Sequence, residues 1–325
     1  MPLVRASGTL LCLASAAAFG AMGVLGKLAY GDGATVGTLL AARFGLAAVV
    51  LWVVVAVSAA RRARMGAICP RDVAAGLALG AVAYAVQAGC YFAALERLDA
   101  SIAALLVYTF PAIVAVGAVA LGRERLDARR AVALVLAGGG LALVVGGAGT
   151  GWLDSAGAAL ALAAALMYAG YILVSDGLAA RLGPLPLTTL VCTGAGVSLV
   201  AGSAALGELR PGAVGAEGWL ALLGLAVVCT VGAIGAFFAG LRRVGPTTAS
   251  ILATGEPVVT VALAFAAFGE TLAAVQLAGG ALVVAAVVAV RAGGRSDRRA
   301  ADRRAARDRR PGRAPAAAAT VTADT

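Results

Sequence analysis

The sequence repeats itself across its middle, and this repeat limits the possible folds more than any other feature. Residues 91–143 align on residues 237–289 at a constant offset of 146, without a gap. The identities include four pairs of less common residues: Phe92/Phe238, Arg97/Arg243, Pro111/Pro257 and Glu124/Glu270. An internal repeat of this length predicts two copies of one structural unit.

The composition places both copies in a membrane. Hydrophobic residues make up 62% of the chain, charged residues make up 13%, and the mean hydropathy is +0.96. A soluble domain needs more polar residues to cover its surface. Since about 20 apolar residues cross the hydrocarbon core, we expect an all-α integral membrane protein. Its ten predicted transmembrane helices are 8–29, 34–57, 73–94, 101–121, 131–148, 155–175, 186–206, 219–240, 247–268 and 272–291.

The first of these spans has a second interpretation. Arg5, a short apolar run and the small residues Ala14 to Ala18 resemble a secretory signal peptide with its cleavage site. The apolar run continues to Ala29, which is long enough to cross the membrane. We therefore expect the segment to be retained as a helix.

The cysteines do not form a recognisable metal or redox motif. The five are far apart in the sequence, none belongs to a CxxC pair, and the chain contains no histidine. We therefore expect no metal site, no cofactor and no histidine-based catalysis.

The net charge of +10 is concentrated at the C-terminus. Residues 291–325 are a low-complexity stretch of Arg and Ala that carries ten of the arginines. We expect the tail 292–325 to be disordered and to contact anionic lipid headgroups. Nucleic-acid binding is not expected, because no aromatic or groove-reading module accompanies the arginines.

The charged loops predict an orientation. Four arginines follow the second span, four the fourth, one the sixth and two the eighth, while the alternate loops hold only Arg97 and Arg210. Basic loops stay in the cytoplasm, so both termini are predicted to be cytoplasmic. Each half then holds an odd number of helices, and the second half must be inserted upside down. The expected domains are a first five-helix repeat at 1–148 and an inverted one at 149–291.

Three charged residues lie inside predicted spans, where each costs about 2.5–3.5 kcal/mol at the helix centre. Arg43 and Glu256 lie about nine residues into their spans, near the midplane. Arg43 either docks an anionic or zwitterionic solute or pairs with Glu256 or a helix carbonyl. Glu256 is either a proton-coupling group or that partner. Lys27 lies near the end of its span, where it can extend toward the headgroups.

Prolines and glycines are expected to shape the spans. Pro111 and Pro257 lie at equivalent points about halfway along their helices, where each removes a backbone hydrogen bond. The resulting kinks could gate or shape a cavity, or could serve packing alone. Gly76 and Gly80 share one face of their helix and predict a close helix contact.

A set of polar and aromatic side chains could line a pocket. Tyr84, Gln87 and Tyr91 share one helix face, because they are spaced three and four residues apart. The other candidates are Tyr108, Tyr168, Tyr171 and Thr254. For each residue an interhelical contact is an equally good interpretation. Glu124 and Glu270 follow equivalent spans, and we expect them to cap helices or anchor hairpins.

These patterns resemble a known family. The segments FGAMGVLGKLA, AARFGLAAVVL, YFAALERLDASIAALLVYTFPAIVAVGAVALGRERL and FFAGLRRVGPTTASILATGEPVVTVALAFAAFGETL are similar to the EamA branch of the drug/metabolite transporter superfamily. The resemblance implies ten helices in two inverted repeats, a central cavity and export of small metabolites, often by proton exchange. It singles out as motif positions Lys27, Arg43, Pro111, Glu124, Glu256, Pro257 and Glu270. Phe19 departs from the tryptophan of many relatives.

The sequence therefore predicts a secondary transporter of the bacterial cytoplasmic membrane rather than an enzyme. It would export amino-acid-like or amphipathic metabolites by alternating access, with coupling to protons through Glu256. Its expected partners are a small-molecule substrate, protons and membrane lipids, and it would be a monomer or a homodimer. The alternative is a polytopic membrane enzyme acting on a lipid-linked substrate, which would need clustered acids, histidines or Ser/Lys pairs. The sequence offers only isolated loop carboxylates.

Overall fold

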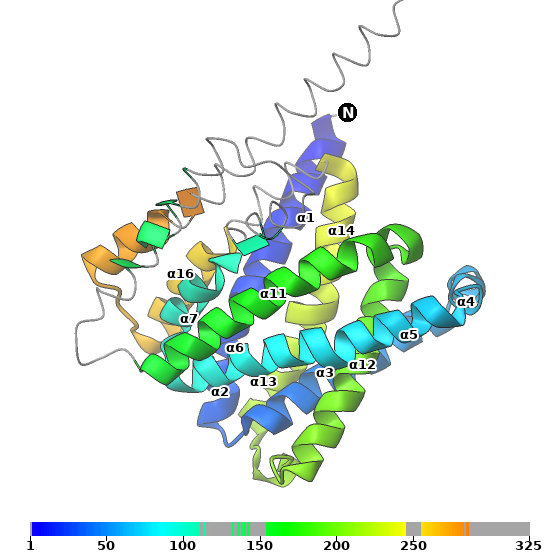
Figure 1. Cartoon of the computed structure of the whole chain (residues 1–325), viewed down its shortest axis with the longest axis horizontal. Helices are drawn as coiled ribbons and strands as arrows, with labels where there is room; N and C mark the ends of the chain where they lie inside the picture. Colours follow the sequence, from blue (N-terminus) through cyan, green and yellow to red (C-terminus); the bar gives the residue numbers. More distant parts are fainter. Residues whose placement is uncertain are drawn as a thin grey trace, which may run out of the picture.

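The chain is a bundle of long helices (Figure 1). The structure, a computed structural model, describes residues 2–110, 154–244, 255–282 and 284–285, with short pieces between 113 and 143. Within these ranges there is no β-strand. Six helical segments are long and apolar enough to cross a membrane: Ser7–Gly31, Val36–Ala56, Pro70–Arg97, Ser155–Ile172, Pro184–Ala205 and Ala216–Phe237. Each matches a predicted span. The predicted helices 101–121, 131–148, 247–268 and 272–291 lie partly or largely outside the described residues.

The first half contains three spans and the start of a fourth. In order they are α1 (Pro2–Gly20) with α2 (Met22–Gly31), α3 (Val36–Ala56), and α5 (Pro70–Ala78) with the π-helical turn η1 (Leu79–Tyr84) and α6 (Ala85–Arg97). A short helix, α4 (Ala59–Gly66), links the second and third spans, and α7 (Ala100–Val107) begins the fourth. The starts follow local rules: Thr35 Oγ1 accepts a hydrogen bond from the Thr38 N–H at 3.1 Å, and Pro70 stands in the first turn of α5.

The second half repeats this pattern. It contains α11 (Ser155–Leu182), α12 (Pro184–Ala205), and α13 (Ala216–Ala226) with the π-helical turn η3 (Val227–Gly232) and α14 (Ala233–Val244). A single 3₁₀ turn, η2 (Pro211–Ala213), precedes α13, and α16 (Glu256–Phe268) follows later. Asp154 begins α11 by accepting hydrogen bonds from the N–H groups of Ala156 and Gly157, at 2.8 and 3.2 Å.

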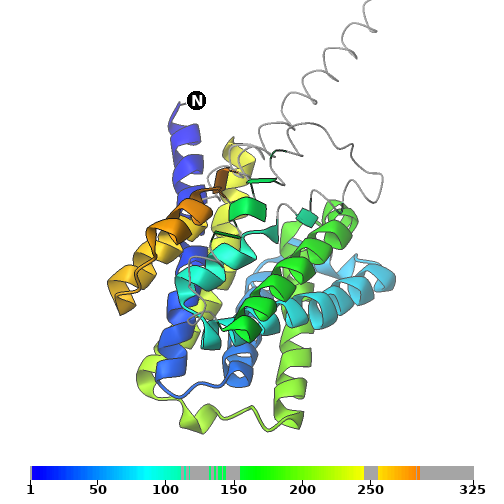
Figure 2. The same ribbon diagram turned by 60° about the vertical axis from the view of Figure 1, so that its left-hand side comes forward.

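Equivalent helices of the two halves run in opposite directions. The turn after α2 and the connection between α12 and α13 meet at one end of the bundle, at the bottom of Figure 2. Glu270, which follows α16, lies at the start of α7. We call this end, where acidic side chains meet helix starts, the capped end. The third span, α5 to α6, runs toward it, whereas its counterpart, α13 to α14, runs away from it. This is the inversion that the loop charges predict.

The two halves pack through small residues. Figure 1 shows α1 beside α14, and Ser15 Oγ donates to Ala233 O at 2.7 Å between them. The tightest crossing lies between the third span and α12. A β-carbon on Gly80 would overlap Val191 O, and one on Gly194 would overlap Leu77 O. The close contact predicted at Gly80 is therefore confirmed.

Replacement of Gly80 by alanine should destabilise the protein, because the added β-carbon meets backbone that cannot move aside. We expect the free energy of unfolding to fall by about 1–3 kcal/mol, measured as a lower melting temperature in detergent. Gly89→Ala on α6 is the matched control, because a β-carbon there has no neighbour within 4 Å among the described atoms. Equal melting temperatures for the two variants would contradict the packing described.

Candidate functional site

One helix ends and another begins at equivalent points of the repeat. Helix α7 ends at Val107 and is followed by a turn at Tyr108 and Thr109, while α16 begins at Glu256 directly after a turn at Gly255. The offset of 146 places Thr109 on Gly255. Helix ends of this kind are tolerated in a membrane only where protein or a cavity satisfies the freed backbone groups.

The structure corrects the prediction for one of the two prolines, Pro257. Pro257 stands in the first turn of α16, where the missing N–H has no helical partner to lose. The predicted kink halfway along a continuous helix is therefore a helix start at this position. Pro111, Glu124 and Thr254 lie outside the described residues.

A hydrogen bond joins the end of α7 to the start of α16. Tyr108 Oη donates to Glu256 Oε2 at 2.8 Å. Tyr108 is buried and Glu256 half-buried. The carboxylate stands at the first residue of α16, where the helix dipole favours negative charge. On the other side, a β-carbon on Gly20 would lie 2.9 Å from Glu256 O, so α1 passes close to this helix start.

Arg43 lies on α3 and is 3% exposed. Its Nε donates to Thr230 Oγ1 at 3.1 Å, and its Cζ lies 4.8 Å from the Phe44 ring centroid and 5.4 Å from that of Phe92. Cation–π attraction and the hydrogen bond together hold the guanidinium. Among the described ion pairs none joins Arg43 to Glu256. Each has a neutral hydrogen-bond partner instead, so this structure does not contain the predicted alternative of a direct pair.

The π-helical turns flank Arg43. Turn η1 ends at Tyr84, and the offset of 146 places Tyr84 on Thr230 of η3. The Tyr84 ring packs edge-on against Phe44, with centroids 5.5 Å apart. Isolated π-helical turns often mark functional sites. Both repeats thus place a π-helical turn beside the same buried cation.

Aromatic rings connect Arg43 with Glu256. The rings stand in successive contact, with centroids between 4.6 and 6.1 Å apart, in the order Phe44, Tyr84, Tyr171, Tyr168, Phe110 and Tyr108. We call these six residues the aromatic chain. Four of them, Tyr84, Tyr171, Tyr168 and Tyr108, were candidates from the sequence, and the fold brings these four rings together. The aromatic chain thus runs from the neighbour of the buried cation to the partner of the carboxylate.

Two other candidates, Gln87 and Tyr91, lie on α6. Tyr91 packs edge-on against Phe92 at 5.1 Å, and Gln87 is half-buried on the same face of α6. A β-carbon on Gly23 would approach the Tyr91 hydroxyl to 3.3 Å, so Tyr91 contacts α2.

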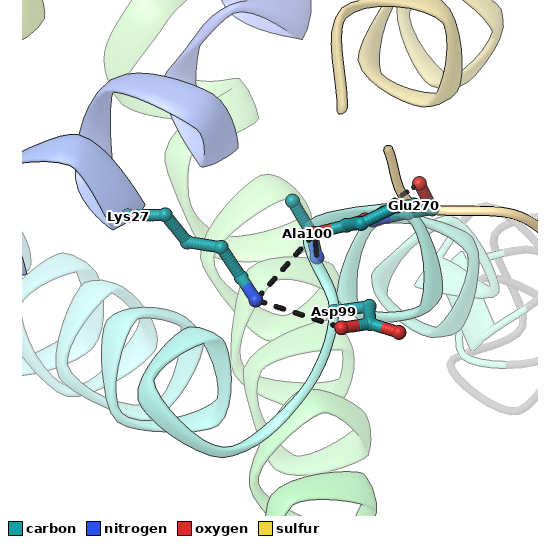
Figure 3. A network of polar contacts seen from close by, with 5 residues as sticks. Lys27, Asp99, Ala100 and Glu270 are labelled. Atoms are coloured by element: carbon teal, nitrogen blue, oxygen red, sulfur yellow. Dashed lines mark hydrogen bonds and ion pairs between the residues drawn. The ribbon is translucent and has the colours of Figure 1, made fainter. Parts of the chain in front are cut away.

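A second polar cluster lies at the capped end (Figure 3). Glu270 accepts hydrogen bonds from the N–H groups of Ala100 and Ser101, each at 3.1 Å, and from Ser101 Oγ at 2.9 Å. Lys27 Nζ lies 3.5 Å from Glu270 and 3.7 Å from Asp99. Glu270 thus caps α7 across the two repeats, as the capping prediction allowed. Lys27 pairs with carboxylates of the protein, whereas its sequence position suggested extension toward lipid headgroups.

The second connection between repeats at this end involves Asp32. Its Oδ2 accepts a hydrogen bond from the Gly218 N–H at 2.6 Å, in the first turn of α13. Nearby, Thr38 Oγ1 donates to Glu208 O and accepts from the Arg210 N–H, at 3.1 and 2.8 Å. Side chains of the first repeat therefore satisfy backbone groups of the second, and Glu270 does the reverse.

The sequence interpretation missed Thr230, Phe44, Phe92, Phe110 and Ser101. Thr230 carried one signal, because it is a polar residue in the apolar run VVCTVG and aligns with Tyr84 at the offset of 146. The aromatic residues resembled ordinary core residues, and nothing in the sequence paired them with Arg43.

The geometry defines a class of protein. Long apolar helices, two related halves of opposite direction and charged groups between them are the design of a membrane transporter. Comparison with known proteins gives the family. The EamA-like transporter family matches residues 6–146 and 155–292, so the chain belongs to this family, within the drug/metabolite transporter superfamily.

Two further similarities agree with this. A protein of Archaeoglobus fulgidus described as an uncharacterized transporter is 33% identical over 201 residues, which are 61% of this chain and 69% of that protein. A solved crystal structure is similar with a TM-score of 0.59 and 22% identity, covering 88% of this chain and 96% of the other. At that identity the likeness shows the fold alone.

Removal of the Glu270 carboxylate should loosen the capped end. Glu270→Ala leaves the N–H groups of Ala100 and Ser101 and the Lys27 ammonium without this acceptor. We expect a loss of about 1–2 kcal/mol in the free energy of unfolding, measured by thermal denaturation in detergent. Glu217→Ala removes an exposed first-turn glutamate of α13 and should have little effect. Identical losses in both variants would argue against the cap.

Proposed function

We propose that this protein is a proton-coupled secondary transporter that exports small amphipathic metabolites bearing a carboxylate, such as amino acids. It has ten transmembrane helices in two inverted repeats, with domains at 1–148 and 149–291. Both termini face the cytoplasm of a bacterium, and the capped end faces outward. The family supports transport over the enzyme alternative.

The observation that carries this proposal is the Tyr108–Glu256 hydrogen bond between the end of α7 and the start of α16. A carboxyl group at the junction of two repeats can be reached from one side and then from the other as the repeats rock. Its described hydrogen-bond partner is a neutral phenol, and none of the ion pairs among the described residues joins it to an arginine. A carboxyl group without a fixed counter-charge in a membrane can take up and release a proton.

We place the solute between Arg43 and Glu256. Its carboxylate meets the Arg43 guanidinium, and its apolar part lies along the aromatic chain. Proton release from Glu256 and solute release are then coupled, because both change the charge in the same space between Arg43 and Glu256.

Alternating access requires the capped end to open. The Lys27–Glu270 pair and the Glu270 cap on α7 join the two repeats there. These contacts must break when the site opens outward and must form again when it opens inward. The structure with these contacts formed is therefore assigned as outward-closed.

Glu256→Gln should abolish transport driven by a pH gradient while leaving solute exchange, because the amide cannot carry a proton. The measurement uses proteoliposomes with an imposed pH gradient and a screen of amino acids, nucleosides and cationic dyes. Exchange of labelled for unlabelled solute without a gradient is measured in parallel.

Glu217→Gln provides the matched control, since it also removes a first-turn helical carboxylate but an exposed one. Gradient-driven uptake that persists at the normal rate in Glu256→Gln would remove the proton-coupling role.

Cross-linking the capped end should stop transport. A protein with Ser101→Cys, Glu270→Cys and Cys69→Ser, treated with a short reducible bifunctional thiol reagent, is expected to lose solute exchange and to regain it on reduction. The same reagent on Ser101→Cys in the Cys69→Ser background controls for simple modification. Exchange at the untreated rate in fully cross-linked protein would show that this end does not need to open.

A further inference from the structure

We propose that Thr230 is a positioning residue of the solute site, which turns Arg43 so that its two Nη groups face the carboxylate of the solute. This inference rests on the function proposed above, because it assumes that Arg43 docks an anionic group. It adds the residue that orients the guanidinium and the reason for a preference for carboxylates.

The Thr230 hydroxyl has a defined direction. Its Oγ1 donates to Leu225 O at 2.8 Å, so its hydrogen is already engaged and its lone pairs are available. Arg43 Nε then donates to the same oxygen at 3.1 Å. Thr230 is 1% exposed. The threonine can therefore act toward the guanidinium only as an acceptor, and it holds the Nε edge.

The opposite edge of the guanidinium is left for another partner. Within the described part of the chain, the Nε bond to Thr230 is the only hydrogen bond from the Arg43 side chain. No described side chain has a fully buried nitrogen or oxygen without a partner. The two Nη nitrogens are therefore not fully buried, although the exposed fraction of Arg43 as a whole is 3%.

The environment of Arg43 favours an anion at this edge. A buried guanidinium without a counter-charge is costly, and none of the described ion pairs includes Arg43. Phe44 and Phe92 restrict the guanidinium from their ring faces. A planar donor pair fixed in this way matches the two oxygens of a carboxylate.

The π-helical turn explains why Thr230 can reach Arg43. A π-helical turn widens the helix and inserts an extra residue, which changes the direction of the side chains that follow. Thr230 lies within η3 and bonds the carbonyl five residues earlier. Its counterpart Tyr84 lies within η1 and packs on Phe44. The two turns thus orient Arg43 from both repeats.

The test compares L-phenylalanine with L-phenylalaninamide, which lacks the carboxylate, in proteoliposome exchange. Thr230→Val keeps the shape and removes the acceptor. We expect the KM for L-phenylalanine to rise about tenfold, with the maximal rate within about twofold and the amide unaffected. Thr230→Ser should restore the KM. Thr189→Val is the matched control, because Thr189 is 0% exposed and also bonds its own helix, at Leu185 O.

The other outcomes separate a failure of this inference from a failure of the proposed function. If Thr230→Val leaves both solutes unchanged while Arg43→Gln removes the preference for the carboxylate, the inference is overturned and the proposed function stands. Equal losses for both solutes in Thr230→Val and Thr189→Val would show a structural role and also overturn the inference. If the wild type carries no carboxylate solute, or if Arg43→Gln changes nothing, the inference and the docking role of Arg43 both fail.

Discussion

The hydrogen bond from Tyr108 to Glu256 joins the end of α7 in the first repeat to the start of α16 in the second. A helix end inside a membrane leaves backbone groups that lipid cannot satisfy. Here α7 ends and α16 begins at equivalent points of an inverted repeat, and the bond brings these two helix ends together. It thus holds polar groups of both repeats in one place, which is where we propose that the solute binds.

Irregular helix geometry recurs around that place. The spans α5 to α6 and α13 to α14 carry the π-helical turns η1 and η3, and the next described helices are α7, which ends at Val107, and α16, which begins at Glu256. Regular helices would leave no freed groups and little capacity for local change. Irregular segments at equivalent sequence positions provide both, while the cross-repeat contacts of Glu270 and Asp32 hold one end closed. In the proposed transport cycle, binding and movement depend on these same segments.

The sequence predicted the spans well and the contacts only partly. Bilayer thickness limits span length, so hydropathy placed the six described spans correctly, and loop charges predicted the opposite directions of the two halves. Pro257 was expected to kink a helix that in fact begins beside it, since sequence alone does not show where a helix stops. Lys27 and Thr230 depend on partners more than 70 residues away, Asp99 and Arg43. Such pairs follow from tertiary packing, which local patterns do not contain.

A structure determined with a transported solute bound would show whether Arg43 and Glu256 hold one solute between them. We expect the solute carboxylate about 3 Å from the Arg43 Nη groups, with its apolar part against the aromatic chain and Arg43 Nε still on Thr230. The Glu256 carboxyl should lie at the other end of the solute. A solute bound away from both Arg43 and Glu256, or Arg43 paired with Glu256 while the solute is bound, would rule out the proposed site.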